Sequence, residues 1–411
     1  MNLNCRFCNT PLKTSFCDLG MSPLSNANLR PEQLNQMEPF YPLHAYVCDA
    51  CLLVQLESFE TPDQIFNDQY AYFSSYSESW LAHANAYSEK MTEHFGLNTD
   101  SRVVEIASND GYLLQYFVKK NIPVIGIEPS GNVARAAREK GVPTLEAFFG
   151  KDTATTLSRE GKSADLLLGN NVLAHVPDLN DFVSGLKILL KPQGVITMEF
   201  PHLLQLIQKN QFDTIYHEHF SYFSFSTVEK VFSAHGLTLF DVDELSTHGG
   251  SLRIYARHAE NESQPITDSI DALRTRESQA GLNCPEGYRN FDEQVRETKR
   301  KLLEFLIDAK RAGKRIVGYG APAKGNTLLN YCGVRTDFID YTVDRSPHKQ
   351  GVYLPGTHIP VRHPDEIAKT KPDYIFILPW NLKDEIISQL SYAREWGAKF
   401  ILPIPQVEVV P

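Results

Sequence analysis

Apolar and amphipathic segments alternate along residues 102–200 of the chain. Apolar runs such as VVEI, VIGI, DLLLG and VITMEF are separated by stretches in which apolar and charged positions follow a helical period. Short apolar runs between helices are typical of parallel strands that are buried on both faces. The pattern therefore predicts an α/β domain with a central parallel sheet covered by helices.

A second region of the same kind begins near residue 315. Residues 284–312 read as a long polar helix whose charged positions are expected to face solvent. The run RIVGYGAPAKGN then predicts a strand, a turn of small residues and a helix, and further strands are expected at Ile339–Val343 and 373–378. The chain is therefore predicted to contain a second Rossmann-like unit near its C-terminal end.

The small-residue turn of this second unit offers contacts for a phosphate-bearing ligand. Backbone N–H groups at a helix start and an ammonium group both attract phosphate, which makes Lys324 the candidate for that contact. Asp344 stands at the carboxyl end of a predicted strand, and we add it and Tyr319 as candidate substrate-binding residues. A Rossmann-like module with a purely structural role is the alternative.

Length and charge narrow the classes of function. With 411 residues and 42% hydrophobic composition, the chain is long enough to bury two or three separate cores. The formal charge of −10 and the pI near 5.7, without a long Lys/Arg run, argue against a nucleic-acid or anionic-membrane surface. We find neither an export signal nor an apolar run of the ~18 residues that span a membrane, so we expect a cytoplasmic location.

Four of the seven cysteines form two close pairs near the N-terminus. Cys5 and Cys8 make one CxxC unit, and Cys48 and Cys51 make the second. A short CxxC turn directs two thiolates at one ion and four thiolates suit tetrahedral zinc, so we expect structural zinc with no open coordination position. A redox dithiol or simply buried cysteines are the alternatives, but a redox pair needs only one CxxC unit.

A tyrosine-rich run, YAYFSSY at residues 70–76, precedes a predicted helix. Its phenol groups, among them Tyr70 and Tyr72, can donate hydrogen bonds to a substrate carbonyl or hydroxyl. The run is therefore either a lid over an active site or a set of rings buried against the next domain.

The first apolar run of the central region ends in a turn of small and polar residues. In a parallel sheet a ligand lies over such a turn, at the carboxyl ends of the strands. Glu128 ends the second strand, where a carboxylate can accept hydrogen bonds from both hydroxyls of an unphosphorylated ribose, as in NAD, FAD or S-adenosylmethionine. The turn itself supplies the candidate cofactor-binding residues Glu105, Ser108, Asn109, Asp110 and Gly111.

This turn lacks the GxGxxG fingerprint, which counts against a pyrophosphate at the helix start. The sequence ExASNDG instead resembles motif I of class I methyltransferases, in which an acidic residue and the turn backbone hold the methionine portion of S-adenosylmethionine. Ala107 and Asn109 replace two glycines that are usual in that motif. Asn170 and Asn171 after the fourth strand, and the run LLKPQGVITMEF, resemble later passages of such methyltransferases. An unrelated Rossmann-like domain is the alternative.

The connection after the fifth strand is longer than a minimal methyltransferase needs, and it overhangs the expected methyl donor. Its polar and aromatic members are Tyr216, His217, Glu218, His219 and Tyr222. They provide a base, a carboxylate to orient it and phenols to polarise an oxygen, so the segment is a candidate catalytic site. If it is extended, Tyr216 and Glu218 face one way and the two histidines the other. Buried structural histidines are the alternative, whereas a metal site lacks evident further ligands nearby.

Five motifs together resemble those of the sugar C-methyltransferases of deoxysugar biosynthesis. They are the paired CxxC units, EIASNDG, YHEHFSYFS, THGGSLRIY and GYGAPAKGNTLLNYCG, and the match runs from Cys5 to about Pro405. Members of this family are three-domain enzymes. The resemblance implies a zinc-binding cap at 1–75, a class I S-adenosylmethionine domain at 76–260 and a C-terminal Rossmann-like domain at 261–411 that helps bind the sugar nucleotide.

The same resemblance assigns roles within the candidate catalytic site. It makes His219 the general base and gives His217 no catalytic role. The side chains that it places around the base are Glu218, Tyr216, His175 and one of Tyr70 and Tyr72, with Tyr72 preferred. We add Tyr222 of the same segment as a candidate substrate-binding residue.

The implied substrate is a nucleotide-linked 4-keto-deoxysugar that carries dTDP, GDP or CDP. A carbon next to a ketone loses a proton to a side-chain base when the enolate oxygen is stabilised, so methylation at C3 calls for a base there and donors at O4. His219 would take the proton, and the enolate carbon would attack the sulfonium methyl group to give a branched-chain sugar. We expect a monomer or a weak homodimer, with S-adenosylmethionine and structural zinc as cofactors.

Two other classes of function fit part of the pattern. The two Rossmann-like units and the acid after the second strand also suit an NAD-dependent nucleotide-sugar dehydrogenase or epimerase, although GxGxxG and a YxxxK dyad are missing. A zinc-capped nucleotide-binding regulator would be non-enzymatic, and the dense His, Glu and Tyr segment argues against it.

Overall fold

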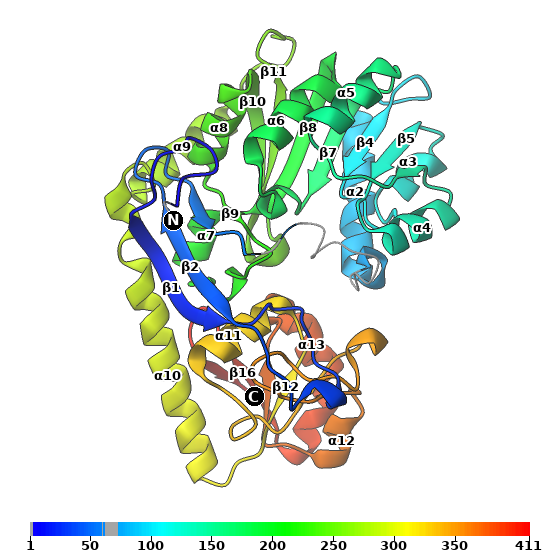
Figure 1. Cartoon of the computed structure of the whole chain (residues 1–411). Helices are drawn as coiled ribbons and strands as arrows, with labels where there is room; N and C mark the ends of the chain where they lie inside the picture. Colours follow the sequence, from blue (N-terminus) through cyan, green and yellow to red (C-terminus); the bar gives the residue numbers. More distant parts are fainter. Residues whose placement is uncertain (1–2, 60, 62–72) are drawn as a thin grey trace.

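The computed structural model describes residues 3–59, 61 and 73–411, which form three β-sheets with helices packed around them (Figure 1). The first sheet has four strands, the second has seven, and the third has six. Each sheet is built mainly from one stretch of the chain, but the cap shares its hydrophobic core with the C-terminal unit, so the cores are less separate than predicted.

The N-terminal sheet is antiparallel and has the strand order β1-β2-β3-β9. Its strands are β1 (Thr14–Ser22), β2 (Tyr41–Val47), β3 (Val54–Leu56) and β9 (Ser221–Tyr222). Leu43, Ala45 and Val47 alternate along β2 and are buried, as a strand with one covered face requires. Because β9 belongs to the long connection after the fifth strand of the central sheet, the predicted catalytic segment completes this cap.

The central sheet has the order β10-β11-β8-β7-β4-β5-β6, in which the last five strands are parallel and β11 is antiparallel to both neighbours. Its strands are β4 (Val103–Ile106), β5 (Val124–Ile127), β6 (Thr144–Leu145), β7 (Ala164–Asn170), β8 (Leu190–Pro201), β10 (Leu237–Leu245) and β11 (Ser251–His258). This is the α/β sheet that the alternating pattern predicts.

Helices cover both faces of the central sheet (Figure 1). They are α2 (Glu78–His94), α3 (Leu114–Lys119), α4 (Gly131–Glu139), α5 (Lys151–Arg159), α6 (Leu179–Leu189) and α8 (Phe225–Ala234). Leu166 and Leu168 of β7 pack into one hydrophobic core while Leu167 packs into the other, because successive side chains of a strand point to opposite faces. Helices on both sides of the sheet thus explain why its strands are apolar throughout.

The C-terminal sheet has the order β14-β13-β12-β15-β16-β17 and is parallel except for β17. Its strands are β12 (Ile316–Tyr319), β13 (Thr342–Val343), β14 (Val361–Arg362), β15 (Tyr374–Ile377), β16 (Lys399–Leu402) and β17 (Glu408–Val410), and its helices include α11 (Ala323–Cys332), α12 (Glu366–Thr370) and α13 (Lys383–Gln389). The predicted second Rossmann-like unit is confirmed.

Helix α10 (Phe291–Arg311) runs along both the cap and the C-terminal unit (Figure 1). Its buried residues Leu302 and Leu306 belong to one hydrophobic core with β1, the connection after β8, and α11. Phe291 stacks on Phe16 of β1 with ring centroids 4.8 Å apart. Its exposed charges pair with one another, as Arg300 does with Glu293 at 2.7 Å, so the expected polar helix is confirmed.

Helix α9 (Asp268–Gln279) packs against α8 and β10 of the central sheet, although it follows residue 261. Glu277 of α9 accepts hydrogen bonds from Phe225 N at 2.6 Å and Ser226 N at 2.9 Å, at the start of α8. The domain limits at 75 and 260 stay a prediction, because neighbouring units share cores and contacts across them.

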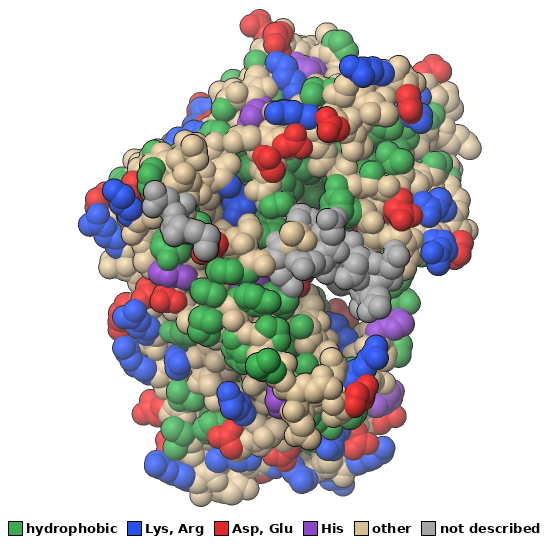
Figure 2. Space-filling model, viewed as in Figure 1, with side chains coloured by type: hydrophobic (Ala, Val, Ile, Leu, Met, Phe, Trp, Pro, Cys, Tyr) green, Lys and Arg blue, Asp and Glu red, His purple; other side chains and the backbone are tan. Residues whose placement is uncertain are grey.

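The surface carries apolar side chains in the middle of one face. Figure 2 shows them around the cap segment that holds Phe40, with charged side chains toward the edges of the molecule. Met21, Met37 and Phe40 of the cap are exposed. Within the described parts of the chain, no helix has the length and apolar character that crossing a bilayer requires.

Candidate active site and zinc site

The four cysteines of the paired CxxC units converge at one point of the cap. Cys5 Sγ lies 3.5 Å from Cys51 Sγ, Cys8 Sγ lies 3.5 Å from Cys48 Sγ, and all four ligand atoms lie within 4.8 Å of one another. Zinc–sulfur bonds of ~2.3 Å in a tetrahedron place sulfurs ~3.8 Å apart, close to this spacing. The four thiols therefore fit one zinc ion, which would hold the two CxxC loops together.

The turn after β4 adopts the backbone shape that glycines usually provide. Ala107, Asn109 and Gly111 have φ angles of 54°, 49° and 75°, in the left-handed region that disfavours side chains. A Cβ on Gly111 would meet Val142 Cγ2 at 2.9 Å. Two residues that are not glycine hold this conformation, so the turn keeps its path at an energetic cost.

Acidic and amide side chains gather at the carboxyl edge of β4, β5 and β7. Burial raises the pKa of Glu105 and of Glu128 above the usual range of a carboxyl group. Glu128 accepts hydrogen bonds from Asn109 N at 3.0 Å and Ser130 N at 2.9 Å, so it ties the β4 turn to the β5 loop. Within the described part of the chain, the buried Asn170 amide has no hydrogen-bond partner. A polar ligand over this edge would satisfy it.

Two further predicted cofactor residues shape the same edge. Asp110 pairs with Lys140 at 2.7 Å, and the side chain of Asn109 accepts a hydrogen bond from Ser74 N at 2.8 Å. Ser108 is fully buried beside Gly126, where an added Cβ would collide with its hydroxyl. The predicted tyrosines Tyr70 and Tyr72 lie outside the described residues.

The predicted catalytic segment forms a turn, which differs from the extended arrangement considered above. His219 N donates to Tyr216 O at 2.9 Å, and the Tyr216 hydroxyl lies 2.8 Å from His219 Nε2. His217 points the other way, because its Nε2 donates to Pro42 O at 3.1 Å. Glu218 accepts a hydrogen bond from Asn26 Nδ2 at 2.6 Å. The turn thus brings Tyr216 and His219 together and directs His217 into the cap.

The hydrogen bonds of His219 fix its tautomer. Its Nδ1 lies 2.9 Å from Thr214 O, and a carbonyl oxygen only accepts, so Nδ1 carries the proton. Nε2 therefore offers a lone pair, to which the Tyr216 hydroxyl donates. This is the arrangement of a general base.

Two other rings border His219. The His175 ring meets it edge to face with centroids 4.6 Å apart, and the buried Tyr222 ring of β9 lies 6.1 Å away. Burial lowers the pKa of His175 to about 4, against the opposing effect of a hydrogen bond with the Glu218 backbone. Burial, followed by the charge of His175, lowers the pKa of His219 well below its usual value. Both imidazoles are therefore neutral at neutral pH.

Family models match three consecutive parts of the chain. A putative zinc binding domain matches residues 5–66, a methyltransferase domain matches residues 79–242, and a C-methyltransferase C-terminal domain matches residues 246–405. The C-methyltransferase NovU of Streptomyces niveus is 34% identical over 406 residues, which are 99% of this chain and 96% of NovU. The chain belongs to the C-methyltransferase family.

As a C-methyltransferase it depends on S-adenosylmethionine and has a zinc-binding N-terminal domain, which confirms the predicted activity and cofactors. Neither the dehydrogenase or epimerase hypothesis nor the regulator hypothesis agrees with this membership. The ubiquinone biosynthesis O-methyltransferase of Bartonella tribocorum is 27% identical over 96 residues, which are 23% of this chain and 39% of that protein.

Solved structures of other proteins resemble parts of this C-methyltransferase. The PH0226 protein of Pyrococcus horikoshii OT3 is 15% identical and aligns over 49% of this chain and 100% of its own, with a TM-score of 0.37. Magnesium protoporphyrin IX methyltransferase of Synechocystis PCC 6803 with bound S-adenosylmethionine is 14% identical, over 47% of this chain and 88% of its own, with a TM-score of 0.32.

Lys324 reaches the histidine cluster from the C-terminal unit of the C-methyltransferase. Its Nζ lies 4.5 Å from the centroid of the Trp380 ring and donates to Asn381 Oδ1. Burial lowers the pKa of Lys324 to about 8, while the charge of Asp213 opposes this. Its own positive charge is one of the factors that lower the pKa of His219. The predicted phosphate contact thus borders the catalytic pocket.

Asp213 and Trp380 join the catalytic segment to the C-terminal unit, and sequence reasoning missed both. Trp380 Nε1 donates to Asp213 Oδ2 at 2.6 Å, and Thr327 Oγ1 of α11 donates to Ile215 O at 3.0 Å. Burial raises the pKa of Asp213 to about 6, although Lys324 and the Trp380 hydrogen bond act against this rise. The only signal in the sequence was that Asp213 lies within the long connection after β8.

His248 was also missed, because THGGSLRIY served only as a motif of the family resemblance and its histidine was given no role. The segment forms a turn that holds His248 at φ 53° with its Nε2 2.9 Å from Asn171 Nδ2. The ring meets Trp80 edge to face at 5.3 Å, and burial lowers the pKa of His248 to about 4. The predicted cofactor residue Asn171 is thereby tied to a third neutral histidine.

Tyr319 and Asp344 lie at the carboxyl edge of the C-terminal sheet. Tyr319 lines a cavity of about 390 Å³ with Arg345 and His363, and its hydroxyl donates to Gln389 Oε1 at 3.3 Å. The Asp344 carboxylate accepts hydrogen bonds from the backbone, including one from Ala321 N at 2.8 Å. Their proposed contacts with substrate stay predictions.

Proposed function

We propose that this C-methyltransferase transfers a methyl group to C3 of a nucleotide-linked 4-keto-deoxysugar, with His219 as the base. The observation that carries the proposal is the half-buried, neutral imidazole whose Nε2 lone pair faces the Tyr216 hydroxyl. Transfer to an oxygen needs no base strong enough to break a C–H bond. His219 Nε2 is unprotonated at neutral pH and can therefore accept the C3 proton, while donors at the enolate oxygen make that proton acidic enough to transfer.

Different residues of the pocket take the C3 proton and stabilise the enolate oxygen. His219 Nε2 takes the C3 proton, and its Nδ1–H bond to Thr214 O holds the ring and supports the positive charge that develops. The Tyr216 hydroxyl, which donates to Nε2 before the substrate binds, and the His175 ring are donors for the enolate oxygen. S-adenosylmethionine supplies the electrophilic methyl group when it is bound.

The charges around the pocket suit a substrate that carries phosphate. The Lys324 ammonium lies at the start of α11 and is buried beside Trp380, so it can pair with a diphosphate without an extended basic surface. Glu105, Glu128 and Asn170 surround the site for the nucleoside and methionine portions of the methyl donor. Tyr319 and Asp344 extend the substrate contacts into the C-terminal unit.

The test is a panel of dTDP-, GDP- and CDP-linked 4-keto-deoxysugars, incubated with S-adenosylmethionine and followed by mass spectrometry. The expected product gains one methyl group at C3 for each S-adenosylhomocysteine released. In D₂O with S-adenosylhomocysteine in place of the donor, C3 should exchange its proton without methyl transfer. Methylation of an oxygen, or transfer without C3 exchange, would overturn the proposal.

A further inference from the structure

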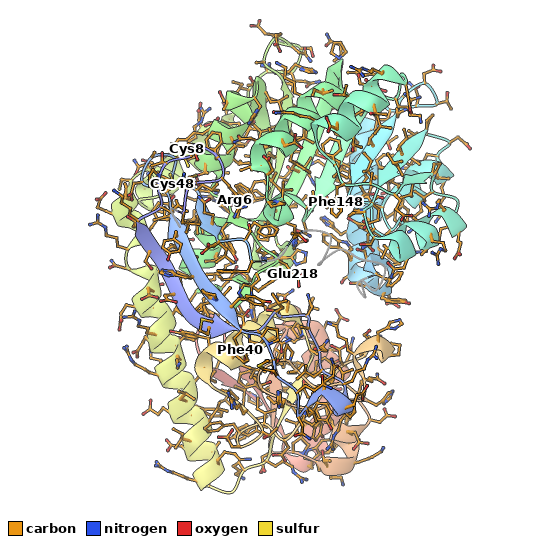
Figure 3. All side chains as sticks on the ribbon, viewed as in Figure 1. Arg6, Cys8, Phe40, Cys48, Phe148 and Glu218 are labelled. Atoms are coloured by element: carbon orange, nitrogen blue, oxygen red, sulfur yellow. The ribbon has the colours of Figure 1, made fainter. Side chains whose placement is uncertain are left out.

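We propose that Arg6, which lies inside the first CxxC unit, is a positioning residue that holds His175 and His219 together. This rests on the proposed function, because it takes both histidines as parts of the catalytic pocket. Figure 3 shows Arg6 on the side of Cys8 and Cys48 that faces the central sheet. Through this side chain the zinc loop reaches the catalytic segment.

The guanidinium of Arg6 contacts the chain next to each histidine. Its Nη1 donates to Pro177 O at 2.8 Å, shortly after His175 in the sequence. The Cζ atom of Arg6 lies 5.4 Å from the centroid of the Phe220 ring, and Phe220 directly follows His219. A planar guanidinium makes its hydrogen bonds in fixed directions, so it can set the spacing of two segments.

Backbone hydrogen bonds continue from Arg6 across the same segments. Arg6 Nη2 donates to Leu56 O of β3 at 2.5 Å, and Leu56 N donates to Phe220 O at 3.1 Å. Phe220 N then donates to Ala174 O at 2.7 Å, which directly joins the chain beside one histidine to the chain beside the other. A shift of Arg6 would therefore be transmitted to both rings.

On its other side Arg6 is tied to the zinc ligands. Arg6 N donates to Gln55 Oε1 at 2.9 Å, and Gln55 Nε2 donates to Cys5 Sγ at 3.2 Å. Gln55 is buried in β3, where it stands opposite Ser221 of β9. One amide side chain, carried by the strand that pairs with β9, thus contacts both a zinc ligand and the Arg6 backbone.

The positive charge of Arg6 links zinc binding to the placement of the two histidines. No carboxylate forms a salt bridge with Arg6 among the described residues, and its Nε is buried there without a partner. Four thiolates around a divalent ion carry a net charge of about −2, and this charge acts on the guanidinium together with that of Asp178. A buried charge needs such compensation, so zinc binding and the placement of the two histidines are linked.

The test compares Arg6→Met and Arg6→Lys with Arg394→Met in the full-length zinc-loaded chain. Arg394 is a matched control, because its guanidinium also lies over a phenylalanine, 5.7 Å from the Phe400 centroid, and donates twice to the backbone oxygen of Pro411. Zinc per chain, S-adenosylhomocysteine affinity, kcat and KM for the keto sugar, and the ¹⁵N resonances of the histidine side chains are measured.

We expect Arg6→Met to keep one zinc per chain and its S-adenosylhomocysteine affinity while kcat falls tenfold or more, since small misplacements of catalytic groups cost up to about 10²-fold. The resonances of His175 and His219 should move, whereas those of the exposed His363 should not. The kcat of Arg6→Lys should lie between those of Arg6→Met and the wild type, because an ammonium group keeps the charge but lacks the planar, forked donors of a guanidinium. Arg394→Met should match the wild type.

Unchanged kcat and unchanged His175 and His219 resonances in folded Arg6→Met would overturn the proposal. If Arg6→Met does not fold, Arg6→Lys decides by the same two measurements. Failure of the wild type to methylate any keto sugar would overturn the proposed function instead, and the resonances of the variants would still test whether Arg6 positions the histidines.

Discussion

The His175 and His219 rings meet edge to face with centroids 4.6 Å apart, although they come from different connections of the central sheet. His175 follows β7, while His219 lies between β8 and β9. Both are neutral because desolvation disfavours the charged imidazolium, and a charge on His175 lowers the pKa of His219 further. The pair therefore forms a base that remains available in mild acid.

The pH profile of C3 proton exchange should show this neutrality. The pKa of His219 lies well below its usual value, so Nε2 already has its lone pair at pH 6.5. We expect kcat/KM for exchange to stay constant from about pH 7, where Lys324 with its pKa of about 8 is charged, to below pH 6.5, and to fall only in more acidic solution. An acidic limb centred near pH 6.5 would contradict the burial of this base.

Stability should respond to acid in the corresponding way. His175 and His248 have folded pKa values of about 4, below that of an unfolded histidine, so the unfolded chain takes up protons first as the pH falls. The stability that these two neutral histidines contribute is fully present above about pH 6.5, and it is lost as the pH falls toward their pKa values in the folded chain. Tm measured from pH 7.5 to 5 should fall less steeply in His175→Gln than in the wild type.

Replacing the base should remove proton abstraction without harming the fold. His219→Asn should reduce both C3 exchange and methyl transfer by a factor of about 10² to 10⁴, the range that general base catalysis contributes. His217→Asn is the control from the same turn, because His217 faces Pro42 and should stay within a few-fold of wild type. Exchange at the wild-type rate in His219→Asn would exclude this residue as the base.

The contact of Trp380 with Asp213 should stabilise the union of catalytic segment and C-terminal unit. Trp380→Phe keeps a ring under Lys324 but leaves the buried Asp213 carboxyl without its donor, which should lower the free energy of unfolding by about 1–3 kcal/mol. Urea denaturation measures this. Trp396→Phe is the control: it removes the hydrogen bond from Trp396 Nε1 to Pro372 O, 3.0 Å long, at a half-buried position. It should lower the free energy of unfolding by less than Trp380→Phe does. Equal losses would show that the Asp213 contact has no special weight.

The strained turn after β4 should accept glycine. The left-handed conformation of residue 107 costs an alanine about 1–2 kcal/mol, and Ala107→Gly removes this cost. The same substitution lowers the free energy of unfolding by about 0.4–1 kcal/mol, because glycine makes the unfolded chain more flexible. Thermal unfolding should therefore show unchanged or raised stability. Ala136→Gly in α4 is the opposite control and should destabilise by roughly 0.5–1 kcal/mol. A clear loss of stability in Ala107→Gly would contradict the strain.

Zinc should be required for the stable fold of the cap. Cys48→Ser removes a buried ligand, so elemental analysis should find less than one zinc per chain, and amide exchange in β1, β2 and β3 should accelerate. Cys284→Ser, outside the cluster, should keep its zinc. Full zinc content in Cys48→Ser would show that the site does not need all four thiols.

Local patterns in the sequence were enough to predict much of the molecule. The alternation of apolar runs and amphipathic stretches gives the central α/β sheet, because burial on both faces demands apolar strands. The CxxC pairs give the zinc site, because ligand type and spacing are local properties. Glu105, Asn109 and Glu128 were predicted for the cofactor edge since the carboxyl ends of parallel strands meet there.

Only the tertiary structure decided which distant residues meet around the base. The turn at Tyr216 and His219, where an extended segment was considered, depends on the Thr214 carbonyl and on the β9 pairing with β3, and no periodicity encodes such contacts. Trp380 reaches Asp213, and Arg6 reaches Phe220, across long stretches of chain. A sequence fixes which side chains are apolar, basic or metal-binding, whereas their distances follow from how separate elements pack, and catalysis depends on those distances.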